Sequence, residues 1–145
     1  MQIHIKKLHD SAVVPQYQTE QSAGMDVAAC IDEPMIIAPH GRAIIPTGFA
    51  IALPSGYEAQ IRGRSGMAAK FGIMPANGVG TIDADYRGEV GVILLNTTDE
   101  PFTVEPGMRV AQMVIAKYEH AMWSEVEELD TTDRGTGGYG STGHA

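Results

Sequence analysis

The sequence contains few of the features on which secreted and membrane proteins depend. Its 145 residues include a single cysteine, Cys30, so no disulfide bond can form within the chain, and this usage fits a reducing compartment. The opening stretch MQIHIKKLHD has no apolar core of the kind that a signal peptide needs, and no apolar run reaches membrane-spanning length. We therefore expect a cytoplasmic protein with no membrane partner.

Basic residues are also scarce. Ten Lys and Arg stand against 18 Asp and Glu, which gives a formal net charge of −8. Because non-specific binding to DNA or RNA needs a basic surface, we expect no nucleic-acid partner. A small phosphorylated ligand is compatible with this charge if the few cations gather at one place. Five arginines lie beside glycines or in turn-like segments and could form such an anion site: Arg62, Arg64, Arg87, Arg109 and Arg134.

Glycine and proline, in contrast, are plentiful. The 17 glycines and 8 prolines interrupt the chain at short intervals, as they do in β-sandwiches and β-barrels. Strand patterns occupy residues 41–54, 88–98 and 106–118, whereas only Ser65 to Gly72 has a helical composition. A chain of this length with 43% hydrophobic residues can bury a core of its own. We predict a single all-β domain over residues 1–145, with one short helix.

The strand predicted at 88–98 differs from the others because it is apolar on both faces. Its sequence, GEVGVILLNTT, places Val, Ile and Leu at consecutive positions. A strand of a half-exposed sheet would alternate apolar and polar residues instead. We expect a neighbouring subunit to cover the second face, which predicts a homo-oligomer.

Polar residues inside apolar stretches are candidates for function, because buried polar groups need partners. Asp26 lies in SAGMDVAAC, Gln112 lies in RVAQMVI, and Asp83 and Asp85 lie two residues apart in GTIDADYRGE. Turn capping, a backbone hydrogen bond and an ordinary surface turn are the simpler alternatives. The aspartate pair could also hold two metal ions or act as glycosidase carboxylates, although no further ligand stands at metal-site spacing nearby.

Three glycine-containing stretches could contact a ligand. RGRSGMAAK places Arg64 and Ser65 at the start of the helix, where free backbone N–H groups can bind an anion. ANGVGTID predicts a hairpin at Asn77 whose bare backbone a flat ligand can approach. The C-terminal DRGTGGYGSTG is either a flexible tail, as its glycines favour, or a strap over a phosphate, as Arg134 and Tyr139 favour.

Five segments, in this order along the chain, resemble the five motifs of the trimeric dUTPase family (deoxyuridine 5′-triphosphate nucleotidohydrolases). They are AGMDVAA (Ala23–Ala29), GRSGMAAK (Gly63–Lys70), NGVGTIDADYRGEVGV (Asn77–Val92), GMRVAQMVI (Gly107–Ile115) and RGTGGYGSTG (Arg134–Gly143). The resemblance spans nearly the whole chain, and five motifs at family spacing are far more specific than one.

The resemblance implies a jelly-roll-like β fold, a β-clip or distorted barrel, assembled as a homotrimer whose active sites each draw residues from all three subunits. It implies hydrolysis of dUTP to dUMP and pyrophosphate, with Mg²⁺ held by substrate phosphates and water and not by direct protein ligands. This reaction keeps uracil out of DNA and supplies dUMP for dTMP synthesis. Residues 134–145 would form a flexible strap that closes over a neighbour's site.

The resemblance also implies a role for each motif residue. Asp83 would orient and deprotonate the water that attacks the α-phosphorus and would touch the sugar 3′-OH, whereas Asp85 would take no part. Tyr86 would pack on the deoxyribose and exclude a 2′-OH, and Asp26 would support the site through water near the metal. The uracil edge would be read by Asn77 and by the main chain from Gly78 to Ile82, which includes Gly80, Thr81 and Ile82.

The remaining motif residues would bind the phosphates and close the site. The phosphate-binding residues would be Arg64, Ser65 and Gly66, with Gln112 at the α-phosphate. The strap would clamp the γ-phosphate with Arg134, Ser141 and Thr142, while Tyr139 stacks over the base beside Gly140. Three departures from the family pattern leave every catalytic group in place: Gly63 replaces a common proline, ANGVG replaces Leu-Asn-Ser-Pro-Gly, and Tyr139 replaces a phenylalanine.

Three other functions are open at this point. A dCTP deaminase shares the fold but needs an added glutamate beside the base, and the nearest glutamate, Glu89, lies beyond Tyr86-Arg87-Gly88. A regulatory binding protein could sense nucleotide and hold a partner protein, although no inserted segment is long enough to suggest one. A structural trimer without activity would have little use for all five motifs.

Overall fold

The structure is a computed structural model that describes residues 1–141 and 143. In chain order, its elements are β1 (His4–Lys7), β2 (Gln16–Tyr17), β3 (Met25–Ala28), β4 (Met35–Ile37), β5 (Arg42–Pro46), β6 (Phe49–Ala52), β7 (Tyr57–Arg62), α1 (Ser65–Phe71), β8 (Ile73–Pro75), β9 (Gly80–Ile82), β10 (Gly91–Asn96), β11 (Phe102–Val104) and β12 (Arg109–Lys117).

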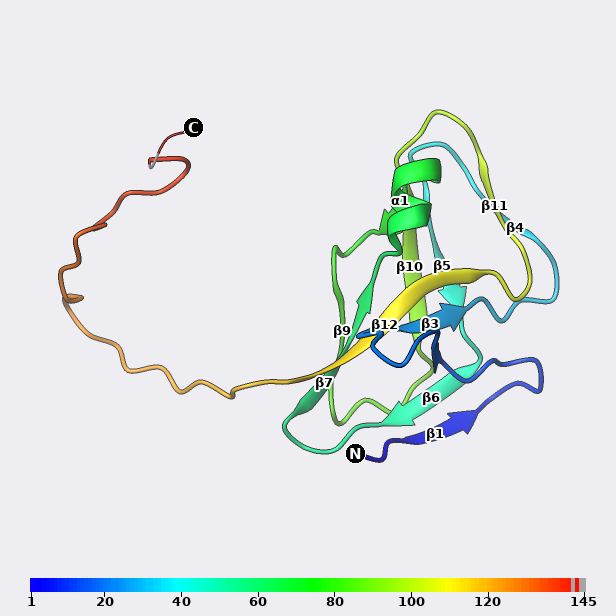
Figure 1. The fold of residues 1–145 in the computed structure, drawn as a ribbon, viewed down its shortest axis with the longest axis horizontal. Helices are drawn as coiled ribbons and strands as arrows, with labels where there is room; N and C mark the ends of the chain where they lie inside the picture. The colour runs from blue at the N-terminus through cyan, green and yellow to red at the C-terminus, as the bar shows by residue number, and fades with distance from the viewer. Residues whose placement is uncertain (142, 144–145) are drawn as a thin grey trace.

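These strands form four sheets (Figure 1). The largest has the order β2-β3-β12-β7-β9, a second has the order β5-β10-β8, and the pairs β1-β6 and β4-β11 complete the set. All the pairings are antiparallel. The predicted all-β class with one short helix is confirmed, and the strands within residues 1–141 form open sheets and no closed barrel.

One cluster of buried apolar side chains joins the sheets. The five-stranded sheet contributes Val27, Ile61 and Met113 to it, and the β5-β10-β8 sheet contributes Ile45 and Leu94. Removing this apolar surface from water is the main force that holds the layers together. The five-stranded sheet, which carries the predicted site residues Asp26, Gly80 and Gln112, therefore packs on the same core as the β5-β10-β8 sheet.

The apolar stretch 41–54 forms two strands that belong to different sheets. The chain turns at Thr47 and Gly48, where Gly48 has a φ of 71°, so β5 pairs with β10 whereas β6 pairs with β1. Four apolar side chains at odd-numbered positions of this stretch are all buried: Ile45, Phe49, Ile51 and Leu53.

Helix α1 occupies the stretch with helical composition. Ala68 and Ala69 are strong helix formers, and Met67 buries the inner face. Gly72 ends the helix in the left-handed conformation at φ 63°, and its N–H donates to Ala68 O (3.1 Å). Within the described residues, no helix is long and apolar enough to cross a membrane.

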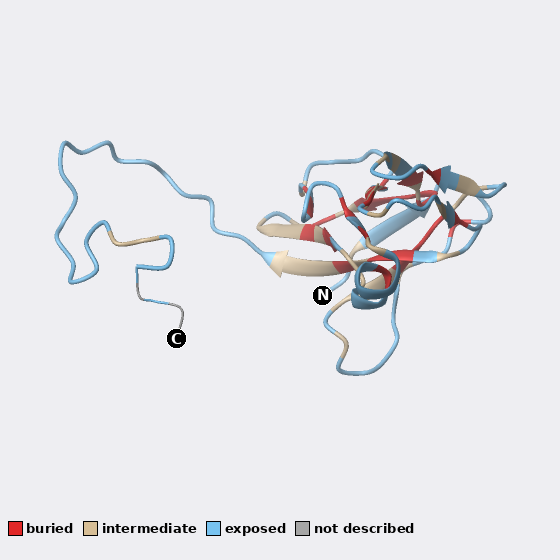
Figure 2. Cartoon of the chain, turned by 90° about the horizontal axis from the view of Figure 1, so that it is seen from above, coloured by how far each residue is buried: buried red, intermediate tan, exposed pale blue. Residues whose placement is uncertain are grey.

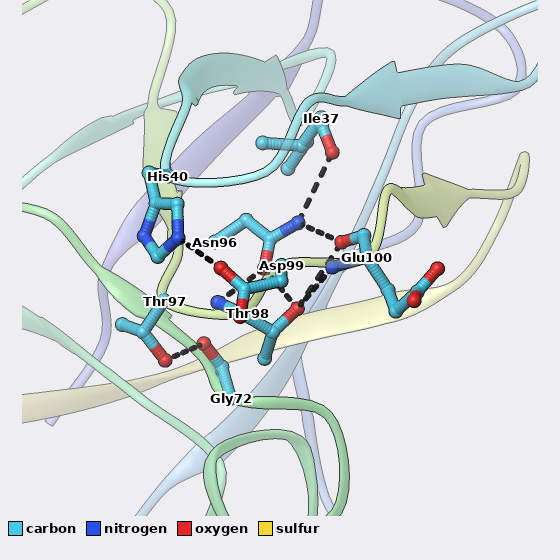
Figure 3. Close-up of polar contacts among 8 residues, drawn as sticks. All are labelled: Ile37, His40, Gly72, Asn96, Thr97, Thr98, Asp99 and Glu100. Carbon is cyan, nitrogen blue, oxygen red and sulfur yellow. Dashed lines mark hydrogen bonds and ion pairs between the residues drawn. The ribbon is translucent and has the colours of Figure 1, made fainter.

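Asn96, at the end of β10, forms hydrogen bonds that hold residues 97–101, the loop between β10 and β11 (Figure 3). It is fully buried, and its Nδ2 donates to Ile37 O (3.2 Å) and to Glu100 O (2.7 Å). Its Oδ1 accepts from the backbone N–H (3.0 Å) and the hydroxyl (2.8 Å) of Thr98. One buried amide thus ties the ends of β4 and β10 together and holds the loop between β10 and β11.

Strand β10 buries alternate residues, and its other face stays uncovered within the chain. Ile93 and Leu95 are only half-buried. Ile93 pairs with Ile44, which is 66% exposed, and Leu95 pairs with Met74, which is 41% exposed. The second apolar face predicted for this strand therefore exists and is open.

Residues 119–141, here called the arm, extend away from the sheets after the end of β12 (Figure 1). Figure 2 shows the arm as exposed along nearly its whole length. Its apolar side chains are among the most exposed in the described structure, with Met122 at 95% and Trp123 at 97%. Tyr118, just before the arm, is the last residue of this region whose N–H bonds to the body, at Gly56 O (3.1 Å).

Candidate active site

Six residues predicted to bind the base and sugar line one cavity of about 240 Å³. They are Asn77, Gly80, Thr81, Ile82, Asp83 and Tyr86. The walls are completed by apolar residues of β7 and β10 and by Glu89. The structure therefore brings these six together, as the motif resemblance implied.

The cavity is shaped by the chain between β8 and β9. Gly80 pairs with Ile61 of β7, and a Cβ at residue 80 would lie 3.2 Å from both Ile61 Cβ and Asn77 Nδ2. The predicted hairpin is wrong in its pairing, because β8 pairs with β10 whereas β9 pairs with β7. A turn closed by Gly78 N and Pro75 O (3.1 Å) joins the two strands instead.

Asp83 lies at the end of β9, where a tight turn follows. The N–H of Tyr86 donates to Asp83 O (3.2 Å), so the two aspartates sit in a turn and not in an extended segment. Arg87 Nη1 bonds back to Ala84 O (2.6 Å) and Tyr86 O (2.9 Å), which stiffens the same turn. Asp83 and Asp85 also line a wider cavity of about 740 Å³, together with Arg87.

A second cluster forms around Asp26, whose side chain is 14% exposed. Its Oδ1 lies 3.1 Å from Arg64 Nε and its Oδ2 lies 2.9 Å from Arg109 Nη1. Arg64 Nη1 also donates to Arg109 O (3.0 Å). One carboxylate thus holds two arginines side by side, although each keeps exposed surface from which it could bind an anion.

Gln112 belongs to the same cluster. On β12 it pairs with Asp26 of β3 on one side and with Arg62 of β7 on the other. Its Nε2 donates to Gly63 O (2.8 Å), which leaves the second amide hydrogen for another acceptor. Ser65 and Gly66 follow Arg64 in the first turn of α1, and both are exposed.

The predicted strap residues lie in the arm, away from both clusters in this chain (Figure 1). Arg134 Nε donates to Gly137 O (2.8 Å), and Tyr139 is fully exposed. Gly140 and Ser141 follow it in the same exposed stretch. Thr142, also predicted to bind the γ-phosphate, lies outside the described residues.

The five arginines singled out in the sequence do not gather at one place in the chain. Arg64 and Arg109 meet at Asp26, whereas Arg62 bonds to Gln60 and Arg87 to its own loop. Arg109 is one of the five arginines of the possible anion site, but the motif resemblance assigned it no role in binding substrate. Its place in GMRVAQ, three residues before Gln112 on the same strand, was the signal that could have added it.

Comparison with known proteins agrees with the motifs. The dUTPase family model matches residues 10–143. The chain is 57% identical over 143 residues to the deoxyuridine 5′-triphosphate nucleotidohydrolase of Rickettsia felis, which covers 98% of this chain and 97% of that protein. It is 52% identical over 146 residues to the protein of the same name from Orientia tsutsugamushi, with 99% of each covered.

Two solved structures have the same fold. A mutant of the Staphylococcus bacteriophage 80alpha dUTPase with dUpNHpp matches with a TM-score of 0.89 at 25% identity over 99% of both chains. A mutant dUTPase from S. aureus phage phi11, described with a structural Mg(II) ion, matches with a TM-score of 0.80 at 23% identity over 89% of this chain and 99% of that one. The family model, the two relatives and the five motifs together show that the chain belongs to the dUTPase family.

Proposed function

We propose that this chain hydrolyses dUTP to dUMP and pyrophosphate. The observation that carries the proposal is the single cavity that collects Asp83, Tyr86, Asn77 and the bare backbone at Gly80. The proposal is further supported by the relatives at 57% and 52% identity, which are named for this reaction. The single free cysteine, Cys30, fits a reducing compartment, and we place the reaction in the cytoplasm.

The cavity would bind the base and the sugar. Asn77 and the main chain of Gly80 to Ile82 would bond to the uracil edge, and the close approach of Gly80 to Ile61 leaves little room for a 5-methyl group. Tyr86 would lie against C2′ of the deoxyribose. A site lined this way rejects a mismatched nucleotide because polar groups that the bound ligand covers would lose their partners.

Asp83 would act as the general base. Its carboxylate would take a proton from a water molecule whose oxygen attacks the α-phosphorus, and the bond from that phosphorus to the bridging oxygen would break as pyrophosphate leaves. One positioned carboxylate is sufficient for this role, because phosphoryl transfer depends mainly on positioning and charge neutralisation. Asp85 would stay outside the reaction.

The cluster at Asp26 would bind the phosphates. Arg64, Ser65 and Gly66 would hold the triphosphate and Gln112 would donate its free amide hydrogen to the α-phosphate. Arg109, which shares Asp26 with Arg64, would add a second cation. Bidentate guanidinium groups suit phosphate oxygens well.

Mg²⁺ would enter with the triphosphate and neutralise part of its charge. Both oxygens of Asp26 already pair with arginines, which fits a carboxylate that supports a metal through water and not by direct ligation. Among residues 1–141 and 143, no group of three or more His, Cys, Asp or Glu is placed to hold a metal ion.

The proposed active unit is a homotrimer with shared sites. The cavity that holds Asp83 with Asn77 and Tyr86 is lined by no Lys or Arg among the described residues, and Arg87, which lines the wider cavity at Asp83, bonds to its own loop. A triphosphate needs cations, and the cluster at Asp26 supplies cations without a free carboxylate. The clusters of two different subunits would complete one site. The open apolar face at Ile44 and Ile93 would be covered by a neighbouring copy, since large exposed apolar patches mark interaction sites.

The arm would carry the third part of the site to a neighbouring subunit. Its exposed Met122 and Trp123 would pack on that subunit, and Arg134, Tyr139, Gly140, Ser141 and Thr142 would close over its nucleotide. Closure would exclude water and stiffen the phosphate contacts.

The test is pyrophosphate release with Mg²⁺ from dUTP, dCTP, dTTP and UTP, with Asp83→Asn and Asp85→Asn as a matched pair. We expect release from dUTP well above the other three, a loss of roughly 10²–10⁴-fold in Asp83→Asn, and near-normal rates in Asp85→Asn. A folded protein that releases no pyrophosphate from dUTP would refute the proposed activity. Equal losses in the two mutants would refute the role of Asp83 as the base.

A further inference from the structure

The loop between β9 and β10, residues 83–90, is anchored at its far end by the side chain of Glu89. Glu89 Oε1 accepts a hydrogen bond from the N–H of Gly48 (2.8 Å) at a part-buried position. The main-chain oxygen of the same residue accepts the hydroxyl of Tyr86 (2.9 Å). Glu89 therefore links the edge of the core to the side chain expected to contact the sugar.

The residue after Glu89 is held by further hydrogen bonds. The next residue, Val90, donates its N–H to Phe49 O (2.9 Å) and accepts the hydroxyl of Thr47 (2.6 Å), which is fully buried. Thr47, Gly48 and Phe49, where β5 turns into β6, therefore form hydrogen bonds to Glu89 and Val90 of the loop.

The ring of Tyr86 lies directly over the backbone of the loop. A Cβ at Gly88 would come within 2.6 Å of Tyr86 Cζ, so the ring rests where a side chain at residue 88 would stand. The bond to Glu89 O then fixes the hydroxyl end of the ring. Tyr86 and Glu89 both line the cavity with Asp83.

We infer that Glu89 is a positioning residue that holds Tyr86 against the sugar and so sets the discrimination between dUTP and UTP. The inference rests on the proposed function, because it assigns sugar contact to Tyr86. A ring fixed at both ends blocks a 2′-OH, whereas a ring free to swing aside would admit it. In this assignment the carboxylate acts through the loop, by its bond to Gly48, and takes no part in the chemical step.

The first experiment measures kcat/KM for dUTP and for UTP in the wild type, Glu89→Ala, Glu89→Gln and Asp85→Ala. Because a hydrogen bond to a charged group that orders a site is worth roughly tenfold or more, we expect the dUTP:UTP ratio to fall about tenfold in Glu89→Ala. Glu89→Gln keeps an acceptor oxygen for the N–H of Gly48 and should restore most of the ratio. Asp85→Ala removes a charge from the same loop and should leave the ratio unchanged.

A double-mutant cycle with Tyr86→Phe separates positioning from a merely structural role. If Glu89 acts through the tyrosine hydroxyl, Glu89→Ala should change the ratio little in the Tyr86→Phe background. Should Glu89→Ala fail to fold by circular dichroism, Glu89→Asp takes its place, since it keeps the charge but is too short to reach Gly48.

Two results would overturn the role of Glu89 but leave the proposed function standing. One is an unchanged dUTP:UTP ratio in Glu89→Ala while the wild type discriminates. The other is that the effects of Glu89→Ala and Tyr86→Phe on this ratio multiply in the double mutant. A wild-type chain that hydrolyses UTP as fast as dUTP would overturn the role of Tyr86, and the inference with it. Hydrolysis of neither nucleotide would instead count against the proposed function itself.

Discussion

Gly24 leaves room for the side chain of Gln112 because it has no side chain of its own. It precedes β3 and lies beneath Gln112, so that an added Cβ would overlap Gln112 Oε1 and lie 3.2 Å from Cδ. Gln112 in turn donates to Gly63 O (2.8 Å) and has one amide hydrogen left for another acceptor, which we propose is the α-phosphate. The size of residue 24 therefore determines where the Gln112 amide can sit.

We predict that Gly24→Ala lowers kcat/KM for dUTP by about ten- to a hundredfold, because small displacements of a positioning group are costly in phosphoryl transfer. Steady-state kinetics on Gly24→Ala, Gln112→Ala and the double mutant test this. If the methyl group acts through Gln112, the double mutant should match Gln112→Ala alone. Losses that multiply would show that Gly24 acts by another route.

The sequence identifies individual site residues better than it identifies their contacts. Asp26 and Gln112 stand out because each is polar within an apolar strand, and their pairing across β3 and β12 agrees with a shared function. The two arginines on Asp26, Arg64 and Arg109, lie 38 and 83 positions away along the chain. No local pattern encodes such a contact, because it exists only once three strands have paired.

Among the elements, existence and type were predictable, whereas partners were not. The helix at 65–71 follows from its composition and from Gly72, and β10 and β12 follow from their apolar runs. The division of 41–54 between two sheets, and the separation of β8 from β9, depend on which distant strands are available for pairing. Such long-range choices are made by the assembled core and not by local propensity.

The buried amide of Asn96 gives a prediction at this scale. We expect Asn96→Ala to lower the free energy of unfolding by about 2–4 kcal/mol, because it leaves the carbonyls of Ile37 and Glu100 without their donor in a part-buried place. Urea denaturation at one fixed protein concentration measures the change. Asp99→Ala, on the same loop but 95% exposed, should stay within about 0.5 kcal/mol of the wild type. Equal losses in both variants would show that the network does not carry this stability.

At the scale of the whole molecule, the chain consists of a packed body and an arm that makes its hydrogen bonds within itself, as Arg134 does with Gly137. Deletion of residues 134–145 should leave folding and subunit number intact and lower dUTP hydrolysis about a hundredfold, because the proposed γ-phosphate clamp and closing strap would be lost. Size-exclusion chromatography with light scattering and a pyrophosphate assay test both parts. A second variant keeps the full length of the chain and replaces Arg134, Tyr139 and Ser141 with glycine, which separates the loss of these side chains from the loss of the segment. Near-normal activity of the deletion variant would show that residues 134–145 are a flexible tail with no role in hydrolysis.

Trp123 provides a direct test of where the arm goes, because it is the one tryptophan in the sequence. In the single chain its side chain is 97% exposed, which would give red-shifted emission that iodide quenches readily. If the arm packs on a neighbouring subunit, the assembled protein should show blue-shifted emission and several-fold weaker quenching.

Ile44→Asp gives the dissociated reference for this measurement, because it places a charge on the open apolar face of β5, where burial against a neighbour would be costly. Emission should move to the red in that variant as the subunits separate, while Ile36→Asp, 68% exposed on β4, should leave both assembly and emission unchanged. Identical emission in the assembled protein and in separated Ile44→Asp subunits would mean that the arm stays in water. The proposed sharing of sites would then depend on the bodies of the subunits alone.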